Sequence, residues 1–100
     1  MPDLTSKQRA HVRGLAHAEK ALVHVGKEGV TPAALRALRQ TFATREIVKV
    51  KVLDAAPEPP RETGTALAEG VDGCTVVQTV GRTVTLFRAD PRNPDRKSVV

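Results

Sequence analysis

The sequence predicts a single compact α/β domain in which helices and strands follow one another in the order α-β-α-β-α-β-β. The chain has 100 residues, 40% of them hydrophobic, which suffices for one modest core. Segments with apolar residues at helical spacing alternate with segments that have the period of a strand. Strands separated by a helix are expected to run parallel and the last two antiparallel, which gives a small four-stranded mixed sheet.

The first helix and strand are short. Thr5 and Gln8 have the spacing of a capping box, so we expect Thr5 to be the N-cap of a helix that runs to about Ala18. Its thin apolar face consists of Val12, Leu15 and Ala16. The apolar run 22–25 then predicts a strand.

The sequence Gly26-Lys27-Glu28-Gly29 connects this strand to a second helix, expected from Pro32 to about Thr44. Thr31 is a preferred N-cap residue, and proline suits the first helical position. Two glycines let the backbone turn sharply and approach a partner, and unpaired N–H groups at the helix start, with its dipole, suit a phosphate. KH-type domains clamp a nucleic-acid backbone with such a GxxG loop. A plain strand-to-helix turn is the alternative.

The run 47–53 alternates at period two, which predicts a strand. Val48, Val50 and Val52 then point to one side, and Lys49 and Lys51 point to the other. A strand with two lysines on one side indicates a sheet with one face open to solvent or to a ligand. The lysines can equally be charges that protect an exposed strand from aggregation.

The second half of the chain begins with a proline-rich connector, 55–60. A weak third helix is expected from residue 61 or 62 to about Val71, shortened by the glycines at 64 and 70. Two strands, 74–80 and 83–88, follow, and Gly81-Arg82 between them predicts a type II′ hairpin with Arg82 at its tip. Residues 89–100 are expected to form a flexible basic tail, so that the domain covers residues 1–88.

Positive charge is unevenly distributed along the chain. The net charge is +5 and the isoelectric point is near 10.0. Residues 1–53 carry a net +6, residues 54–73 a net −4 and residues 74–100 a net +3. This segregation favours a basic face for a polyanion. We expect the third helix, residue 61 or 62 to about Val71, which holds most of the acidic charge, to face away from the polyanion.

Several classes of function are disfavoured. With only Phe42 and Phe87 as aromatic residues, the chain cannot build the aromatic platform on which RRM and OB folds stack bases. No nucleotide-binding loop, nucleophile elbow or metalloprotease motif occurs, so we expect no enzyme activity and no small-molecule substrate. His11, His17 and His24 lack the spacing of metal ligands, and we expect neither a metal nor a cofactor.

The remaining features concern environment and assembly. No apolar run is long enough to span a bilayer, and the start of the chain lacks the apolar core of a signal peptide. The single cysteine, Cys74, fits a reducing compartment and is expected to be a small buried hydrophobe. We therefore expect a cytoplasmic monomer that does not bind membranes.

Taken together, several motifs in this order resemble the YhbY-like CRM family, the chloroplast RNA splicing and ribosome maturation domain. The motifs, which extend over residues 4–88, are Leu4-Thr5-Ser6-Lys7-Gln8-Arg9, Gly14-Leu15-Ala16-His17, Val25-Gly26-Lys27-Glu28-Gly29, Ile47-Val48-Lys49-Val50-Lys51-Val52, Arg61-Glu62-Thr63-Gly64 and Val80-Gly81-Arg82-Thr83-Val84-Thr85-Leu86-Phe87-Arg88. The resemblance implies a fold similar to the C-terminal domain of translation initiation factor three. It also implies RNA binding centred on the GxxG loop and, for stand-alone members, association with the precursor of the large ribosomal subunit.

From these observations we expect a protein that binds ribosomal RNA in a precursor large subunit and assists assembly. The RNA-binding residues predicted from the loop, the basic motifs and the second helix are Gly26, Lys27, Glu28, Gly29, Lys7, Arg9, Arg36, Arg39, Lys49, Lys51 and Arg82. An adaptor that docks on a ribosomal protein or assembly factor is the main alternative. A DNA-binding regulator is a weaker one, because no helix-turn-helix with a base-reading face is evident.

Overall fold

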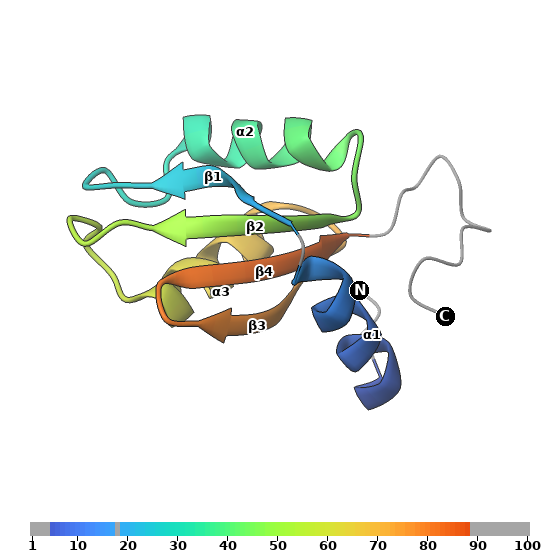
Figure 1. Cartoon of the computed structure of the whole chain (residues 1–100). Coiled ribbons are helices and arrows are strands. Elements are labelled where there is room, and N and C mark those ends of the chain that lie inside the picture. Colours follow the sequence, from blue (N-terminus) through green and yellow to red (C-terminus); the bar gives the residue numbers. More distant parts are fainter. Residues whose placement is uncertain (1–4, 18, 89–100) are drawn as a thin grey trace.

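The computed structural model describes residues 5–17 and 19–88 and has the predicted order of elements (Figure 1). The helices are α1 (Ser6–Ala16), α2 (Pro32–Phe42) and α3 (Pro60–Gly70), and the strands are β1 (Ala21–Val25), β2 (Ile47–Val52), β3 (Cys74–Val80) and β4 (Thr83–Arg88). The predicted tail, 89–100, lies outside the described residues. Within the described part, no helix has the length and apolar character needed to cross a membrane.

The four strands form one mixed sheet in the order β1-β2-β4-β3. β1 and β2 are parallel, whereas β4 is antiparallel to both of its neighbours. β3 therefore runs parallel to β2 even though β4 lies between them. Both helical connections join parallel strands and the hairpin joins antiparallel ones, so the predicted topology is confirmed.

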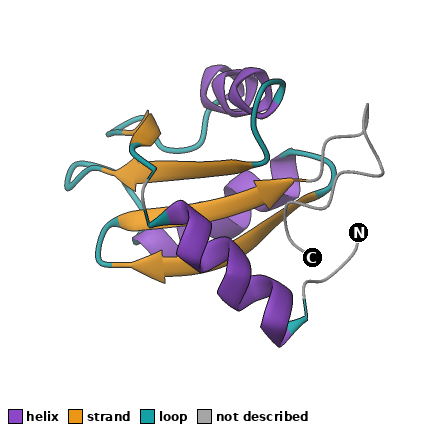
Figure 2. Cartoon of the chain, turned by 45° about the vertical axis from the view of Figure 1, so that its right-hand side comes forward, coloured by secondary structure: helices purple, strands orange, loops and turns teal. Residues whose placement is uncertain are grey.

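Helices cover the two faces of the sheet unequally. On one face, Leu38 and Phe42 of α2 and Leu67 of α3 pack against buried valines of the strands and form the main core. The opposite face carries only α1, which crosses in front of the strands in Figure 2. There Val12 packs on Val77 and Phe87. Because α1 is the sole described helix on this face, part of the sheet stays uncovered.

Arg9 fixes α1 to the sheet. Its Nη1 atom donates hydrogen bonds of 2.8 Å to the carbonyl oxygens of both Val76 and Val77. The pairing of β3 with β4 shifts register between Val76 and Gln78, and such a bulge leaves backbone groups outside the ladder. Arg9 satisfies two of these carbonyls and therefore has a structural role.

The helix ends follow from local chemistry, with three departures from prediction. The Thr5 hydroxyl accepts from the Gln8 N–H at 3.1 Å and the Gln8 side chain accepts from the Thr5 N–H at 3.0 Å, so the capping box is confirmed. α1 ends at Ala16 and leaves Leu15 42% exposed, and α2 ends at Phe42.

The third departure is α3, which starts earlier than expected and is not shortened. It spans 11 residues, Pro60–Gly70, with Gly64 buried inside it. A Cβ at Gly64 would lie 2.8 Å from Val84 Cγ1, so this glycine allows the helix to approach β4 closely. The glycine that weakens the isolated helix is required by its packing.

Candidate nucleic-acid interface

Three connections gather at one end of the sheet, at the left in Figure 1. β1 and β2 end side by side, with Val25 opposite Val52. The β3–β4 turn lies next to them, because the Val52 N–H donates to the Arg82 carbonyl at 2.8 Å. We call this region, residues 26–30, 53–59 and 81–82, the loop end. The GxxG loop is therefore flanked by the β2–α3 connector and the hairpin.

The GxxG loop is a hydrogen-bonded turn that packs against Pro57 of the β2–α3 connector. The Gly29 N–H donates to the Gly26 carbonyl at 2.9 Å. Gly29 has φ +70°, and a Cβ there would lie 3.0 Å from Pro57 Cγ, so both backbone conformation and packing require glycine. Lys27 and Glu28 lie exposed at the apex. The turn thus presents one cation and one anion on a fixed backbone.

The start of α2 keeps part of the predicted set of unpaired N–H groups. The Thr31 hydroxyl accepts from the Ala34 N–H at 3.1 Å, and Pro32 has no N–H. Thr31 and Ala33 keep backbone N–H groups without a hydrogen-bond partner among the described residues. The N-cap and the proline that start the helix therefore reduce the number of free donors without removing them.

Arg82 folds back from the hairpin onto the end of β2. Its Nε donates to the Val52 carbonyl and its Nη2 to the Leu53 carbonyl, each at 2.8 Å. Its Nε also lies 3.1 Å from Asp54 Oδ1. Arg82 thereby holds the connector in place, while its Nη1 makes no hydrogen bond or ion pair within the described part of the chain.

One acidic residue of the connector that precedes α3 lies at the loop end. Asp54, 94% exposed, stands beside Arg82, and Pro57 of the same connector packs on Gly29. The reason is topological: β2 ends beside β1, so the residues that follow β2 start next to the loop. An anionic group therefore belongs to this surface.

The uncovered part of the sheet on the α1 side continues the loop end. We call it the open half. Strand pairing places its members next to one another, since His24 lies opposite Lys51 and Lys49 lies opposite Thr85. Its residues are His24, Lys49, Lys51, Gln78, Val80, Thr83 and Thr85. None is acidic, and neither lysine forms an ion pair within the described chain.

A hollow of about 310 Å³ lies on the open half, against the end of α1. It is lined by His17, Lys49, Gln78, Val80, Thr83 and Thr85. Of these residues, only Lys49 was predicted as a site residue. Period-two alternation assigns Thr83 and Thr85 to one face of their strand, but only the pairing of β4 with β2 places them beside Lys49.

The remaining predicted residues lie elsewhere. Arg36 and Arg39 are exposed on α2, on the opposite side of the sheet, and Arg39 donates to the Gly70 carbonyl at 3.2 Å. Lys7 is exposed in the first turn of α1, a helix that lies at the other end of the sheet from the loop end (Figure 1). Arg9 is held by β3. The structure thus brings together the residues of the GxxG loop with Lys49, Lys51 and Arg82.

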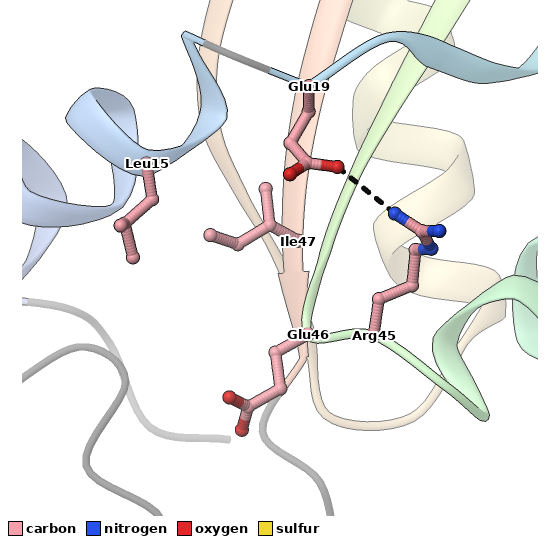
Figure 3. A pocket seen from close by; sticks show the side chains of 5 residues that line it. All are labelled: Leu15, Glu19, Arg45, Glu46 and Ile47. Atoms are coloured by element: carbon pink, nitrogen blue, oxygen red, sulfur yellow. Dashed lines mark hydrogen bonds and ion pairs between the residues drawn. The ribbon is translucent and has the colours of Figure 1, made fainter.

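A second hollow, of about 240 Å³, has a different chemistry (Figure 3). It is lined by Leu15, Glu19, Arg45, Glu46 and Ile47. Arg45 forms an ion pair with Glu19 at 3.0 Å, and the Glu46 carboxylate also lines the cavity. Because the Arg45 charge is already paired with Glu19, the described lining of this hollow offers no free cation to a polyanion.

Cys74 is buried in the core, as predicted. Burial raises the pKa of its thiol from 9.0 to about 12, and the nearby Arg88 charge opposes the shift. Such a thiol is unreactive at neutral pH. In the described part of the chain, no three His, Cys, Asp or Glu residues are grouped to hold a metal ion.

Comparison with known proteins gives consistent matches. Residues 4–88 match the model of the CRS1 / YhbY (CRM) domain. The Bacillus subtilis protein named Probable RNA-binding protein YqeI is 32% identical over 90 residues, which are 90% of this chain and 93% of that protein. A Haemophilus influenzae protein named RNA-binding protein is 31% identical over 88 residues, 88% of each chain.

A solved structure is also similar. The solution structure of a hypothetical Staphylococcus aureus protein, described as a candidate RNA-binding protein, superposes with a TM-score of 0.77 and 27% sequence identity. The similarity covers 95% of this chain and 98% of that one.

Proposed function

The chain belongs to the CRS1 / YhbY (CRM) domain family, and from this membership we propose that it binds RNA with its loop end and open half. The observation that supports the proposal is that Lys49 and Lys51 share one side of β2, and that β2 ends beside β1 and the GxxG turn, where Lys27 is exposed. Ammonium groups without protein partners neutralise phosphates. The relatives named for RNA binding support the same ligand.

In the proposed mechanism, the RNA backbone lies over the GxxG turn. Gly26 and Gly29 let the phosphate chain approach closely, and the positive end of the α2 dipole adds to the attraction. Lys27 neutralises a phosphate there, while Lys49 and Lys51 neutralise others along β2. Arg82 contributes its remaining nitrogen and holds the connector that supports the turn.

We further propose that the RNA is ribosomal RNA in a precursor of the large subunit, and that the protein assists assembly without catalysing a reaction. The family resemblance supports this target. The buried, reduced thiol of Cys74 fits a cytoplasmic location.

The test is RNA affinity as a function of salt for the native protein and for Lys27→Glu. We expect the logarithm of affinity to fall with the logarithm of salt concentration with a slope of about −2 to −3, because about three phosphates are neutralised. Lys27→Glu should lower affinity about ten-fold at low salt. Arg13→Glu is the matched control, because Arg13 is exposed on α1 and away from the loop end.

The adaptor alternative predicts a different result. If the protein docks on a ribosomal protein, Lys27→Glu leaves the association with ribosomal particles intact, and RNA affinity is weak and independent of this residue. A salt slope near zero for isolated RNA would contradict the electrostatic mechanism.

A further inference from the structure

We propose that the hollow on the open half holds one unpaired nucleotide of the bound RNA. The inference rests on the proposed function, because it adds a base-reading subsite to the same surface. The subsite uses Gln78, Thr83 and Thr85, which line the hollow and are not part of the loop end.

Thr85 carries the inference. Its side chain lines the hollow and only 1% of the residue is exposed, yet its hydroxyl makes no hydrogen bond with a described residue. Buried polar groups in proteins are nearly always hydrogen-bonded. Every described side-chain nitrogen or oxygen that is sealed from solvent has a partner, so the Thr85 oxygen keeps a small accessible area on a residue that lines the hollow. It is placed to bond a ligand there.

The other polar side chains around the hollow are also free to bind a ligand. His17, Lys49, Gln78 and Thr83 also line the hollow without making a side-chain hydrogen bond to a described residue. None of its described lining residues carries a carboxylate. Val80, 63% exposed, supplies an apolar wall. A volume of about 310 Å³ is at the lower end for ligand pockets, which start at roughly 300 Å³.

This combination fits a nucleotide. The Gln78 amide and the threonine hydroxyls both donate and accept, as the edge of a base requires. The Lys49 ammonium suits the attached phosphate, and Val80 can contact the face of the base. Phe42 and Phe87 are buried, so among the described lining residues His17 supplies the ring that can stack on a base. The amide and hydroxyl groups contact base edges. A base in a duplex is paired and stacked, so only an unpaired one can enter.

One RNA strand can reach both the GxxG loop and the hollow. Lys49 and Lys51 point to the same side of β2, which ends beside Val25, the residue before Gly26. The four residue steps from Lys49 to Leu53 correspond to about 13 Å of strand. About four stacked nucleotides span this distance at ~3.4 Å each. Lys49 lines the hollow, and Lys51 lies between it and the loop.

The test compares Thr85→Val with Thr79→Val on two RNA probes, a stem with an unpaired loop and a fully paired duplex of equal length. Thr85→Val removes the hydroxyl and keeps the shape. We expect it to weaken binding of the looped RNA about five-fold, to leave duplex binding unchanged, and to leave urea stability equal or higher. Thr79 lies opposite Val84 and faces the other side of the sheet, so Thr79→Val should change neither affinity. Thr85→Ser should restore looped-RNA binding.

Other results separate the two proposals. Unchanged looped-RNA affinity in Thr85→Val, or an equal loss for both probes, would overturn the subsite while RNA binding stands. Nuclear magnetic resonance with nucleoside 5′-monophosphates gives a second readout, in which the backbone amides of Gln78, Thr83 and Thr85 should shift. If these amides shift but neither RNA binds, the hollow is supported and the proposed function fails. If neither occurs, both are overturned.

Discussion

The two halves of the sheet face that α1 crosses use positive charge in opposite ways. In the covered half, cations are bonded into the protein: Arg9 binds two carbonyls of β3 and Arg45 pairs with Glu19. In the open half, Lys49 and Lys51 have no such partners. A basic sequence therefore indicates a binding surface only after the structural cations are set aside.

The division follows side-chain chemistry. A guanidinium presents several donors in a rigid plane and can bind two or three acceptors at once, as Arg9 and Arg82 do. An ammonium on a flexible stem gains little from such fixed sites and remains in solvent. The lysines of the open half are thus better placed than these arginines for an incoming phosphate.

The largest effect is expected in the covered half. Arg9→Ala leaves the Val76 and Val77 carbonyls without their donor and should lower the free energy of unfolding by about 2–3 kcal/mol. Urea denaturation measures the change. Arg13→Ala, one turn further along α1 and exposed, should stay within about 0.5 kcal/mol. Equal effects of the two variants would contradict the structural role of Arg9.

Alkaline pH tests the core beneath both halves. Because the pKa of Cys74 is raised from 9.0 to about 12, the unfolded chain loses the thiol proton at lower pH than the folded protein. The stabilisation that comes from keeping the Cys74 thiol protonated is therefore fully present below pH 9. As the pH rises toward 12, the free energy of unfolding falls by up to about 1.4 kcal/mol per pH unit. Urea denaturation from pH 8 to 11 should show a steeper decline for the native protein than for Cys74→Ala. Parallel declines would show that the thiol is solvated.

In the open half, charge removal should affect RNA binding rather than stability. Lys49→Gln with Lys51→Gln should weaken RNA binding about five- to ten-fold at low salt and reduce the magnitude of the salt slope by about 1–2. Arg36→Gln with Arg39→Gln, on the opposite side of the sheet, removes the same charge. If the α2 double variant loses more RNA affinity than the lysine double variant, the RNA binds the α2 side of the sheet instead.

The sequence was sufficient for the elements but not for the division between the halves. Capping residues, period-two alternation and the glycine of the hairpin are local signals, and they predicted the order of helices and strands and the turn at Gly81, whose φ is +57°. Which cations stay free depends on contacts such as that of Arg9 with β3, 67 and 68 residues away. The neighbours of Lys49 depend on β4 lying between β2 and β3, and no local pattern encodes that order.

The smallest effect concerns the one carboxylate known to lie beside Arg82. Asp54→Asn removes an exposed negative charge from the loop end, so it should raise RNA affinity about two- to three-fold at low salt, with the gain shrinking as salt screens it. Stability should change little, because Arg82 keeps its bonds to the Val52 and Leu53 carbonyls. Asp72→Asn changes net charge equally, but it precedes β3 at the other end of the sheet. If both variants raise RNA affinity alike, the net charge of the protein rather than the loop end attracts the RNA. If only Asp54→Asn raises it, the RNA phosphates pass close to the connector, where the Asp54 carboxylate weakens binding.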